Sequence, residues 1–244
     1  MARRILLAVL VIASFLFGFE LGKSLVRCEC KVPIINATFK SIRFPIVAVD
    51  SHGNGVLEYA TLKIIPGHGN LYLRLNPFVE PDTQYSFETA VSVACRYAHE
   101  DCSKYDFILE IHSNAILVGG PSAGAAIALA TYLLLENKTW GDYAVTGAIE
   151  PDGTISQVGG ILQKAEAAYE HGYKIFFVPK GQSKVIIYKK VVRKKLIGPF
   201  IITTIDYVPE VLDLNKYFKG MKIIEVKDFG ELVSYVMKPG PLEE

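Results

Sequence analysis

The distribution of apolar residues divides the chain into an apolar N-terminal block and a longer region of short segments. Residues 5–19 contain no charged side chain and follow two arginines, Arg3 and Arg4. Beyond residue 43, apolar runs of strand or helix length alternate with turns rich in glycine, proline and asparagine. This alternation of apolar runs and turns predicts a folded domain built from short strands and helices.

The segmented region predicts a mixed, layered α+β architecture. We expect strands at residues 46–49, 57–65 and 71–75 to form an antiparallel meander, followed by a helix at residues 84–97 with apolar positions near the 3.6-residue period. The other expected strands are residues 105–111, 115–118, 143–149, 154–158, 174–178, 200–204 and 222–226. The other expected helices are residues 123–135, which are apolar on nearly all sides, 161–171, 208–218 and 229–237.

The N-terminal block is typical of a segment that enters or crosses a membrane. Its 15 apolar residues extend to 18 positions before Lys23, with Glu20 as the one acid, whereas a spanning helix needs about 20 residues. We therefore expect residues 1–22 to be a signal anchor, with a cleaved signal peptide and a buried core helix as alternatives. Residues 23–43 then form a stalk and residues 44–240 the domain. The two arginines place that domain outside the cytoplasm, either membrane-anchored or secreted.

Composition and charge exclude several classes of protein. The 244 residues are 50% hydrophobic and carry a net charge of +1, which disfavours both intrinsic disorder and a polybasic nucleic-acid binder. We expect no nucleic-acid partner and one sizeable domain.

The four cysteines show no zinc-ligand spacing, so we expect no metal. Cys95 and Cys102 lie at and just after the end of the helix expected at residues 84–97. They form either a disulfide or two reduced thiols.

Ser122 is the first candidate for chemistry. In Gly119-Gly-Pro-Ser-Ala-Gly124, the serine stands at or beside the start of a buried helix. Free N–H groups and the positive end of the helix dipole lie there, which suits the stabilisation of an oxyanion. The alternative interpretation of Ser122 is an ordinary helix N-cap.

Lys164 is the second candidate. It follows a glycine pair in Val158-Gly-Gly-Ile-Leu-Gln-Lys164 and lies about one turn into a helix. Burial lowers the pKa of a lysine, so an inward-facing Lys164 can accept a proton from a serine near neutral pH. A solvated surface lysine is the alternative.

His112 offers a different base. It stands at a predicted strand end, ten residues before Ser122, and would define a Ser122–His112 hydrolase. The alternative is a strand histidine with no catalytic role. A metalloprotease is disfavoured because the sequence contains no H-E-x-x-H motif.

Three motifs together resemble the proteolytic domain of Lon proteases, the Ser–Lys peptidases of family S16. They are Gly119-Gly-Pro-Ser-Ala-Gly124, Ala144-Val-Thr-Gly147 and Gly153-Thr-Ile-Ser-Gln-Val-Gly-Gly-Ile-Leu-Gln-Lys164, and both their order and their spacing match. The resemblance covers residues 44–179 well. It implies a fold like that of ribosomal protein S5 domain 2.

The resemblance also implies roles for individual residues. Ser122 would be the nucleophile, Lys164 the base, and Thr146 the residue that orients the Lys164 amine. Gly120, Pro121 and Ala123 would belong to the oxyanion or substrate loop. The implied substrates are proteins or peptides, and the implied assembly is a homo-oligomeric ring. A non-catalytic module that binds peptide or assembles a ring is the alternative.

The chain also departs from the family pattern. Bacterial Lon has an acid three residues before the serine, where this chain has Gly119, and Ala148 replaces the acid that often follows the Thr-Gly pair. Residues 183–217 form a longer segment than the bacterial pattern predicts. No G-x-x-x-x-G-K-[ST] loop occurs in the sequence, so we expect no ATP or other cofactor on this chain.

Overall fold

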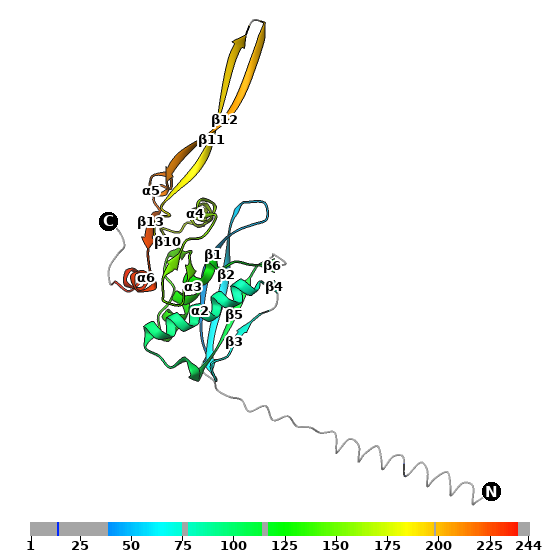
Figure 1. Cartoon of the computed structure of the whole chain (residues 1–244). Coiled ribbons are helices and arrows are strands. Elements are labelled where there is room, and N and C mark those ends of the chain that lie inside the picture. Colours follow the sequence, from blue (N-terminus) through cyan, green and yellow to red (C-terminus); the bar gives the residue numbers. More distant parts are fainter. Residues whose placement is uncertain (1–13, 15–38, 75–77, 114–116, 198, 239–244) are drawn as a thin grey trace, which may run out of the picture. The chain divides into compact units, whose positions relative to one another are not determined.

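The chain divides into two units, residues 1–37 and 38–244, and the computed structural model describes essentially the second. The described residues are 39–74, 78–113, 117–197 and 199–238, together with Ser14 (Figure 1). The signal anchor expected at residues 1–22 lies outside them. In the part of the chain that is described, no helix combines the length and the hydropathy needed to cross a membrane.

The first sheet contains four strands in the order β1-β2-β5-β3. Strands β1 (Lys40–Val49), β2 (Gly55–Pro66) and β5 (Tyr105–His112) pair antiparallel, whereas β3 (Leu71–Leu73) pairs parallel with β5. The predicted meander is therefore wrong at its third strand, because β5 occupies the position beside β2. Strand β1 also begins within the predicted stalk, since Lys40 already pairs with Ile64.

Two helices cover one face of this sheet and enclose the larger core. They are α2 (Pro81–Ala98) and α3 (Gly124–Leu135), which pack side by side (Figure 1). Helix α3 is buried on nearly all sides, as its apolar sequence predicts. The short 3₁₀ helix η1 (Cys102–Lys104) follows α2, and the disulfide Cys95–Cys102 joins the two.

The second sheet is parallel and has the order β13-β10-β7. Its strands are β7 (Tyr143–Val145), β10 (Ile175–Pro179) and β13 (Lys222–Val226), and helices α4 (Ile161–Glu170) and α6 (Phe229–Val236) accompany them. The single strand expected at residues 143–149 breaks at Thr146 and Gly147, after which β8 (Ala148–Ile149) pairs with β9 (Ile155–Ser156). Strands β4 (Phe78–Val79) and β6 (Leu117–Val118) form a further small pair. The mixed architecture is confirmed.

A long two-stranded hairpin extends from the second sheet region as an arm (Figure 1). It consists of β11 (Lys184–Ile197) and β12 (Phe200–Asp213), and the short helix α5 (Leu214–Tyr217) follows. The helix expected at residues 208–218 is therefore wrong over residues 208–213. Pro209 lacks an N–H and disfavours a helix interior, and this segment instead completes the ladder with β11.

Candidate active site around Ser122

Ser122 lies in a 3₁₀ turn that leads directly into α3. The turn η2 (Pro121–Ala123) begins at Gly120, whose φ of 94° is in the region that glycine adopts at no steric cost. A Cβ on Gly124 would lie 2.6 Å from Ser86 Oγ and 2.9 Å from Ile149 Cγ2. Glycine at this position therefore allows the start of α3 to approach α2 and β8 closely. Ser122 itself is half-buried.

Three consecutive carbonyl groups of this turn each accept a hydrogen bond from a buried hydroxyl group. Thr83 and Ser86, one turn apart on α2, donate to the carbonyls of Gly120 and Pro121, each at 3.3 Å. Thr146 Oγ1 donates to the carbonyl of Ser122, also at 3.3 Å. The backbone of the turn is thus held on its carbonyl side by side chains from two different elements.

Thr146 is fully buried at the end of β7 and connects the second sheet to the Ser122 turn. Its N–H donates to the carbonyl of Phe177 on β10 at 3.0 Å, and the N–H of Gly147 donates to the carbonyl of Ser122 at 2.9 Å. The N–H of Ala125 in turn donates to the carbonyl of Gly147 at 3.0 Å. The hydrogen bond that Thr146 donates therefore goes to Ser122. Its hydroxyl oxygen can still accept a bond, so the predicted contact with the Lys164 amine stays a prediction.

Lys164 lies in the first turn of α4 and is only 4% exposed. Its helix packs into an apolar cluster that includes Val47, Ala144 and Ala165. Burial lowers the pKa of the Lys164 ammonium group from 10.5 to about 8, because the charged form loses hydration. Within the described part of the chain, no carboxylate forms an ion pair with it.

The Ser122 turn and helix α4 both pack against β1. The fold thereby brings the two elements that carry Ser122 and Lys164 to the same strand, and a hydrogen bond attaches Thr146 to the serine. Of the predicted loop residues, Pro121 and Ala123 belong to η2 and Gly120 is its N-cap residue.

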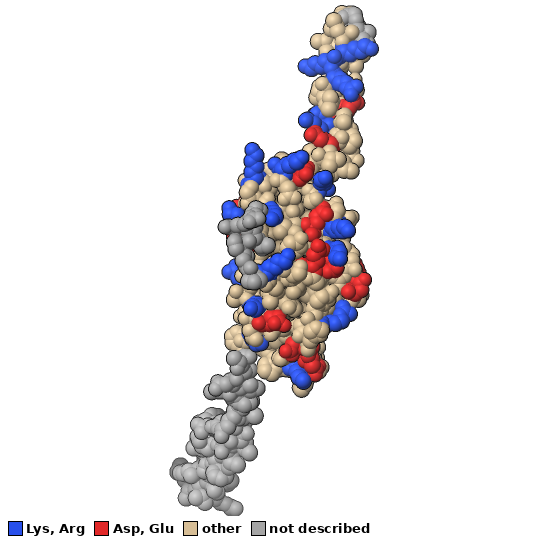
Figure 2. All heavy atoms as spheres, turned by 90° about the vertical axis from the view of Figure 1, so that its left-hand side faces the viewer, with Lys and Arg blue, Asp and Glu red and all other residues tan. Residues whose placement is uncertain are grey.

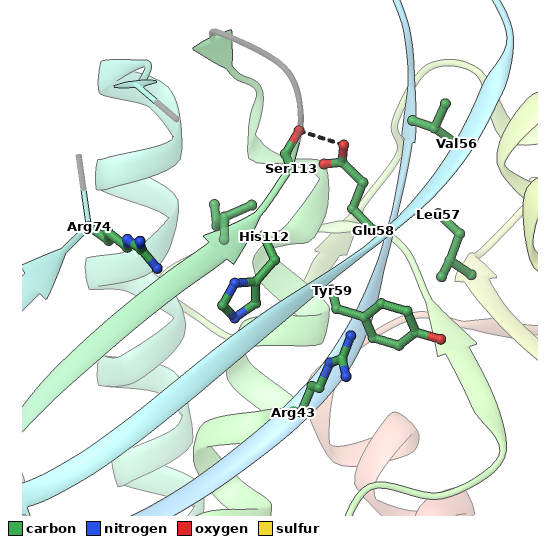
Figure 3. Close-up of a pocket in the computed structure, with 9 residues that line it drawn as sticks. Arg43, Val56, Leu57, Glu58, Tyr59, Arg74, His112 and Ser113 are labelled. Carbon is green, nitrogen blue, oxygen red and sulfur yellow. Dashed lines mark hydrogen bonds between the residues drawn. The ribbon is translucent and has the colours of Figure 1, made fainter. Parts of the chain in front are cut away.

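His112 takes part in a different site. Its Nε2 atom lies 2.9 Å from Thr61 Oγ1, and its side chain lines an open pocket of about 690 Å³ on the first sheet. Figure 3 shows Arg43, Arg74 and His112 around this space, with Arg43 4.2 Å above the Tyr59 ring. Ser122 is not among the residues that line this pocket, and the hydrogen bond of the His112 ring goes to Thr61.

Three residues next to the Ser122 turn are not among those predicted from the sequence. Thr83 and Ser86 are two of them, and Thr83 lies just before the helix predicted at residues 84–97, so their i, i+3 spacing on α2 becomes visible only in the structure. The third is Glu80, which immediately precedes α2. A Cβ on Gly119 would lie 1.8 Å from Glu80 Oε2, so the Glu80 carboxylate fills the space beside the glycine that replaces the family acid. No local sequence signal connects residues 80 and 119.

No cluster of histidine, cysteine, aspartate or glutamate that could hold a metal ion occurs among the described residues.

Comparison with known proteins identifies the family of the chain. A model of the Lon protease (S16) C-terminal proteolytic domain matches residues 54–216. A Lon protease of Fervidobacterium nodosum is 29% identical over 197 residues, which cover 78% of this chain and 23% of that protein. An Archaeal Lon protease of Pyrococcus abyssi is 30% identical over 60% of this chain and 14% of its own length. A Lon protease of Paraburkholderia phytofirmans is 34% identical over 51% of this chain and 16% of its own length.

The layered α+β fold and the serine turn thus define a proteolytic domain. The chain belongs to the family of the Lon protease (S16) C-terminal proteolytic domain, a family of serine peptidases. It spans less than a quarter of the length of the relatives described above.

Proposed function

We propose that the protein is a serine endopeptidase that cleaves unfolded or flexible proteins through Ser122 and Lys164. The observation that carries this proposal is the buried Lys164, whose pKa of about 8 makes about one-tenth of the amine neutral at pH 7, against far less for an ordinary lysine. Helix α4 and the Ser122 turn share β1 as a packing partner, which supports an approach of the two side chains.

The proposed reaction has two halves that use the same two side chains. Ser122 Oγ attacks the peptide carbonyl carbon while its proton passes to the neutral amine of Lys164. The tetrahedral intermediate then loses its C–N bond, and the Lys164 ammonium gives that proton to the departing amine. In the second half, Lys164 takes a proton from water and the resulting hydroxide attacks the ester carbonyl carbon. The bond between that carbon and Ser122 Oγ then breaks, which releases the carboxylic acid product, and the Lys164 ammonium returns the proton to Ser122 Oγ.

The Ser122 turn also supports an oxyanion site. Ser86 and Thr146 hold the carbonyls of Pro121 and Ser122, and the same two peptide groups carry the N–H groups of Ser122 and Ala123 on their opposite side, where a negative oxygen can bind. The carbonyl that Thr83 holds belongs to the Gly120–Pro121 peptide group, which has no N–H. We assign this role to the N–H of Ser122 and a neighbour in the loop of Gly120, Pro121 and Ala123. Thr146 then acts as a positioning residue for the serine.

The proposed function also includes how the chain assembles, whether cleavage needs ATP, and on which side of the membrane the domain lies. We propose a homo-oligomeric ring, by similarity to Lon proteases. We propose that peptide cleavage by this chain does not require ATP, because its sequence contains no G-x-x-x-x-G-K-[ST] loop. We also propose that residues 1–22 hold the domain outside the cytoplasm as a signal anchor, or direct its secretion.

The test combines cleavage of an unfolded protein such as casein with labelling by a serine-directed covalent probe. Ser122→Ala should abolish both cleavage and labelling, and Lys164→Gln should abolish cleavage. The matched controls Ser156→Ala and Lys180→Gln should retain both, as should His112→Ala. ATP with magnesium should leave the rate unchanged.

Each contrary result points to a specific error. Full activity in Lys164→Gln would remove the lysine from the mechanism, and loss of activity in His112→Ala alone would favour the histidine. Absence of cleavage and labelling in the unchanged protein would support a non-catalytic, peptide-binding module.

A further inference from the structure

The β11–β12 hairpin has two faces, which the pairing of its strands defines. Residues opposite each other across an antiparallel pair share one side of the ribbon. The apolar face carries the even-numbered residues of β11 from Ile186 to Leu196 and the odd-numbered residues of β12 from Ile201 to Val211. The ion-paired face carries the alternate residues, from Ile187 to Lys195 and from Ile202 to Glu210.

Exposed hydrophobic side chains are concentrated on the apolar face. Eight large apolar side chains of the described residues are exposed there, against two on the ion-paired face. Tyr188 is 70% exposed and Leu196 71%. A solvent-exposed apolar stripe of this size marks an interaction site. A two-stranded ribbon is also only marginally stable alone in water, so a partner on this face would stabilise it.

Charge is divided between the same two faces. On the ion-paired face, Lys189 lies 3.5 Å from Glu210 and Arg193 lies 3.4 Å from Asp206. The apolar face between its first and last exposed residues contains Lys190 and Lys194 and no acid. From residue 184 to residue 213 the hairpin holds six basic and three acidic residues, which leaves +3, whereas the whole chain carries +1. Figure 2 shows these basic side chains along the arm.

The partner of the apolar face must therefore be both apolar and negatively charged. A second copy that used the same face would bring Lys190 and Lys194 against their own counterparts. Protein–protein interfaces are depleted in lysine and enriched in aromatic residues, methionine and arginine. The apolar face has two tyrosines, Tyr188 and Tyr207, but no methionine or arginine, and its only charged residues are two lysines. Lysines with long aliphatic stems, tyrosines and branched apolar residues are the side chains of an element that lies at a membrane–water interface.

We propose that the apolar face of the β11–β12 hairpin docks onto an anionic lipid surface. The hairpin lies parallel to the surface, because its two outer edges carry unpaired backbone groups that hydrocarbon cannot satisfy. Its apolar side chains enter the boundary between head groups and acyl chains, and Lys190 and Lys194 reach the lipid phosphates. The ion pairs of the opposite face stay in water.

The first test places a fluorescent reporter on each face of the hairpin in the full-length protein. Val192→Trp reports on the apolar face and Val208→Trp on the ion-paired face, and Trp140, the one native tryptophan, gives a constant background. Vesicles of phosphatidylglycerol with phosphatidylcholine should shift the emission of the tryptophan at 192 to shorter wavelength. Brominated acyl chains should quench it, while the tryptophan at 208 is unaffected. Bromine quenches only a tryptophan that lies close to the acyl chains, so binding of residues 1–22 to the vesicles does not by itself quench the tryptophan at 192.

Three results would overturn the proposal. They are the absence of quenching at position 192, equal quenching at both positions, and a shift at 192 that appears with protein concentration or with unfolded casein but not with vesicles. The last result would assign the face to a second copy or to substrate instead.

The second test addresses the charge. Lys190→Gln with Lys194→Gln, in the Val192→Trp background, should weaken binding to anionic vesicles by about fivefold for each lysine. Lys189→Gln with Lys195→Gln makes the same charge change on the ion-paired face and should have a clearly smaller effect. Equal losses for the two pairs would show that only net charge matters, which contradicts docking by the apolar face.

Discussion

The hydroxyl of Thr146 donates a hydrogen bond to the main-chain carbonyl of Ser122 over 3.3 Å. The same carbonyl oxygen accepts a second bond from the N–H of Gly147 at 2.9 Å. Both bonds come from the Thr-Gly segment at which β7 ends, so the second sheet fixes the direction in which the Ser122 peptide group points. In the proposed mechanism, this keeps the Ser122 carbonyl from turning toward the developing oxyanion.

Replacement of Thr146 should therefore affect the rate more than substrate binding. Thr146→Val keeps the shape of the side chain and removes the donor, so we expect a lower kcat with little change in KM and a stability loss of about 1 kcal/mol. Thr146→Ser restores the donor and should restore most of the rate. Peptide cleavage kinetics and chemical denaturation measure the two effects. Equal rates in the valine and serine variants would show that only packing matters at this position.

The pH dependence of cleavage should follow Lys164. With a pKa of about 8, its neutral, base-competent form increases roughly tenfold per pH unit below that value and saturates above it. We expect kcat/KM for a substrate without titrating groups to rise up to about pH 8 and then level off. A profile that is flat between pH 6 and 9, or that falls with pH, would contradict a role for Lys164 as the base.

The same burial should make the folded state less stable below pH 8. There both the folded and the unfolded chain carry the Lys164 proton, and the folded state holds a poorly hydrated charge. Between about pH 8 and 10.5 the folded state has released that proton while the unfolded state keeps it, so the free energy of unfolding rises with pH. Above both values the charge penalty is gone.

Comparison with an apolar variant isolates the free-energy cost of burying the Lys164 charge. Lys164→Met should be more stable than the unchanged protein at pH 7 by an amount on the order of 3 kcal/mol, and the difference should shrink toward pH 10.5. The exposed Lys180→Met serves as the control and should show no such trend. Denaturant unfolding at a series of pH values measures both, and a pH-independent difference for Lys164→Met would show that its pKa is not lowered.

Features that depend on local pattern were predictable from the sequence. Helix α3 follows from an apolar run after a glycine-rich turn. The Cys95–Cys102 disulfide is one of the two alternatives that the sequence left open. The turn at Ser122 was recognisable for the same reason. In contrast, Thr83 and Ser86 meet the carbonyls of Gly120 and Pro121 only after α2 and α3 have packed, and no local pattern encodes that contact.

Only residues 200–204 of the hairpin were predicted as a strand, and the remainder was missed for a related physical reason. Most of its residues are exposed on both faces, so burial does not impose an alternation of apolar and polar positions on its sequence. Lysines fall on both faces of β11, which makes the segment look like a basic stretch rather than a strand. Likewise, β5 takes the place beside β2 through long-range pairing, which turn patterns around residues 66–70 cannot reveal.

The contact between Gly119 and Glu80 predicts the effect of restoring the family acid. Gly119→Asp would direct its side chain into the Glu80 carboxylate and add a like charge, so we expect a stability loss of about 1–3 kcal/mol and slower cleavage. The double variant Gly119→Asp with Glu80→Ala opens the space and should recover most of both. Denaturation and cleavage kinetics on the four members of this cycle give the coupling, and additive effects would show that the two positions do not interact.

The disulfide between Cys95 and Cys102 should stabilise the end of α2 through loop closure. The cysteines are seven residues apart, and closing so short a loop in the unfolded chain corresponds to about 2–3 kcal/mol. Cys95→Ala with Cys102→Ala should lower the free energy of unfolding by that amount and make it insensitive to reductant. The unchanged protein should lose a similar amount when dithiothreitol is added. A reductant effect that persists in the double variant would assign it to another pair of thiols, and no effect in either protein would mean that the bridge contributes no net stability.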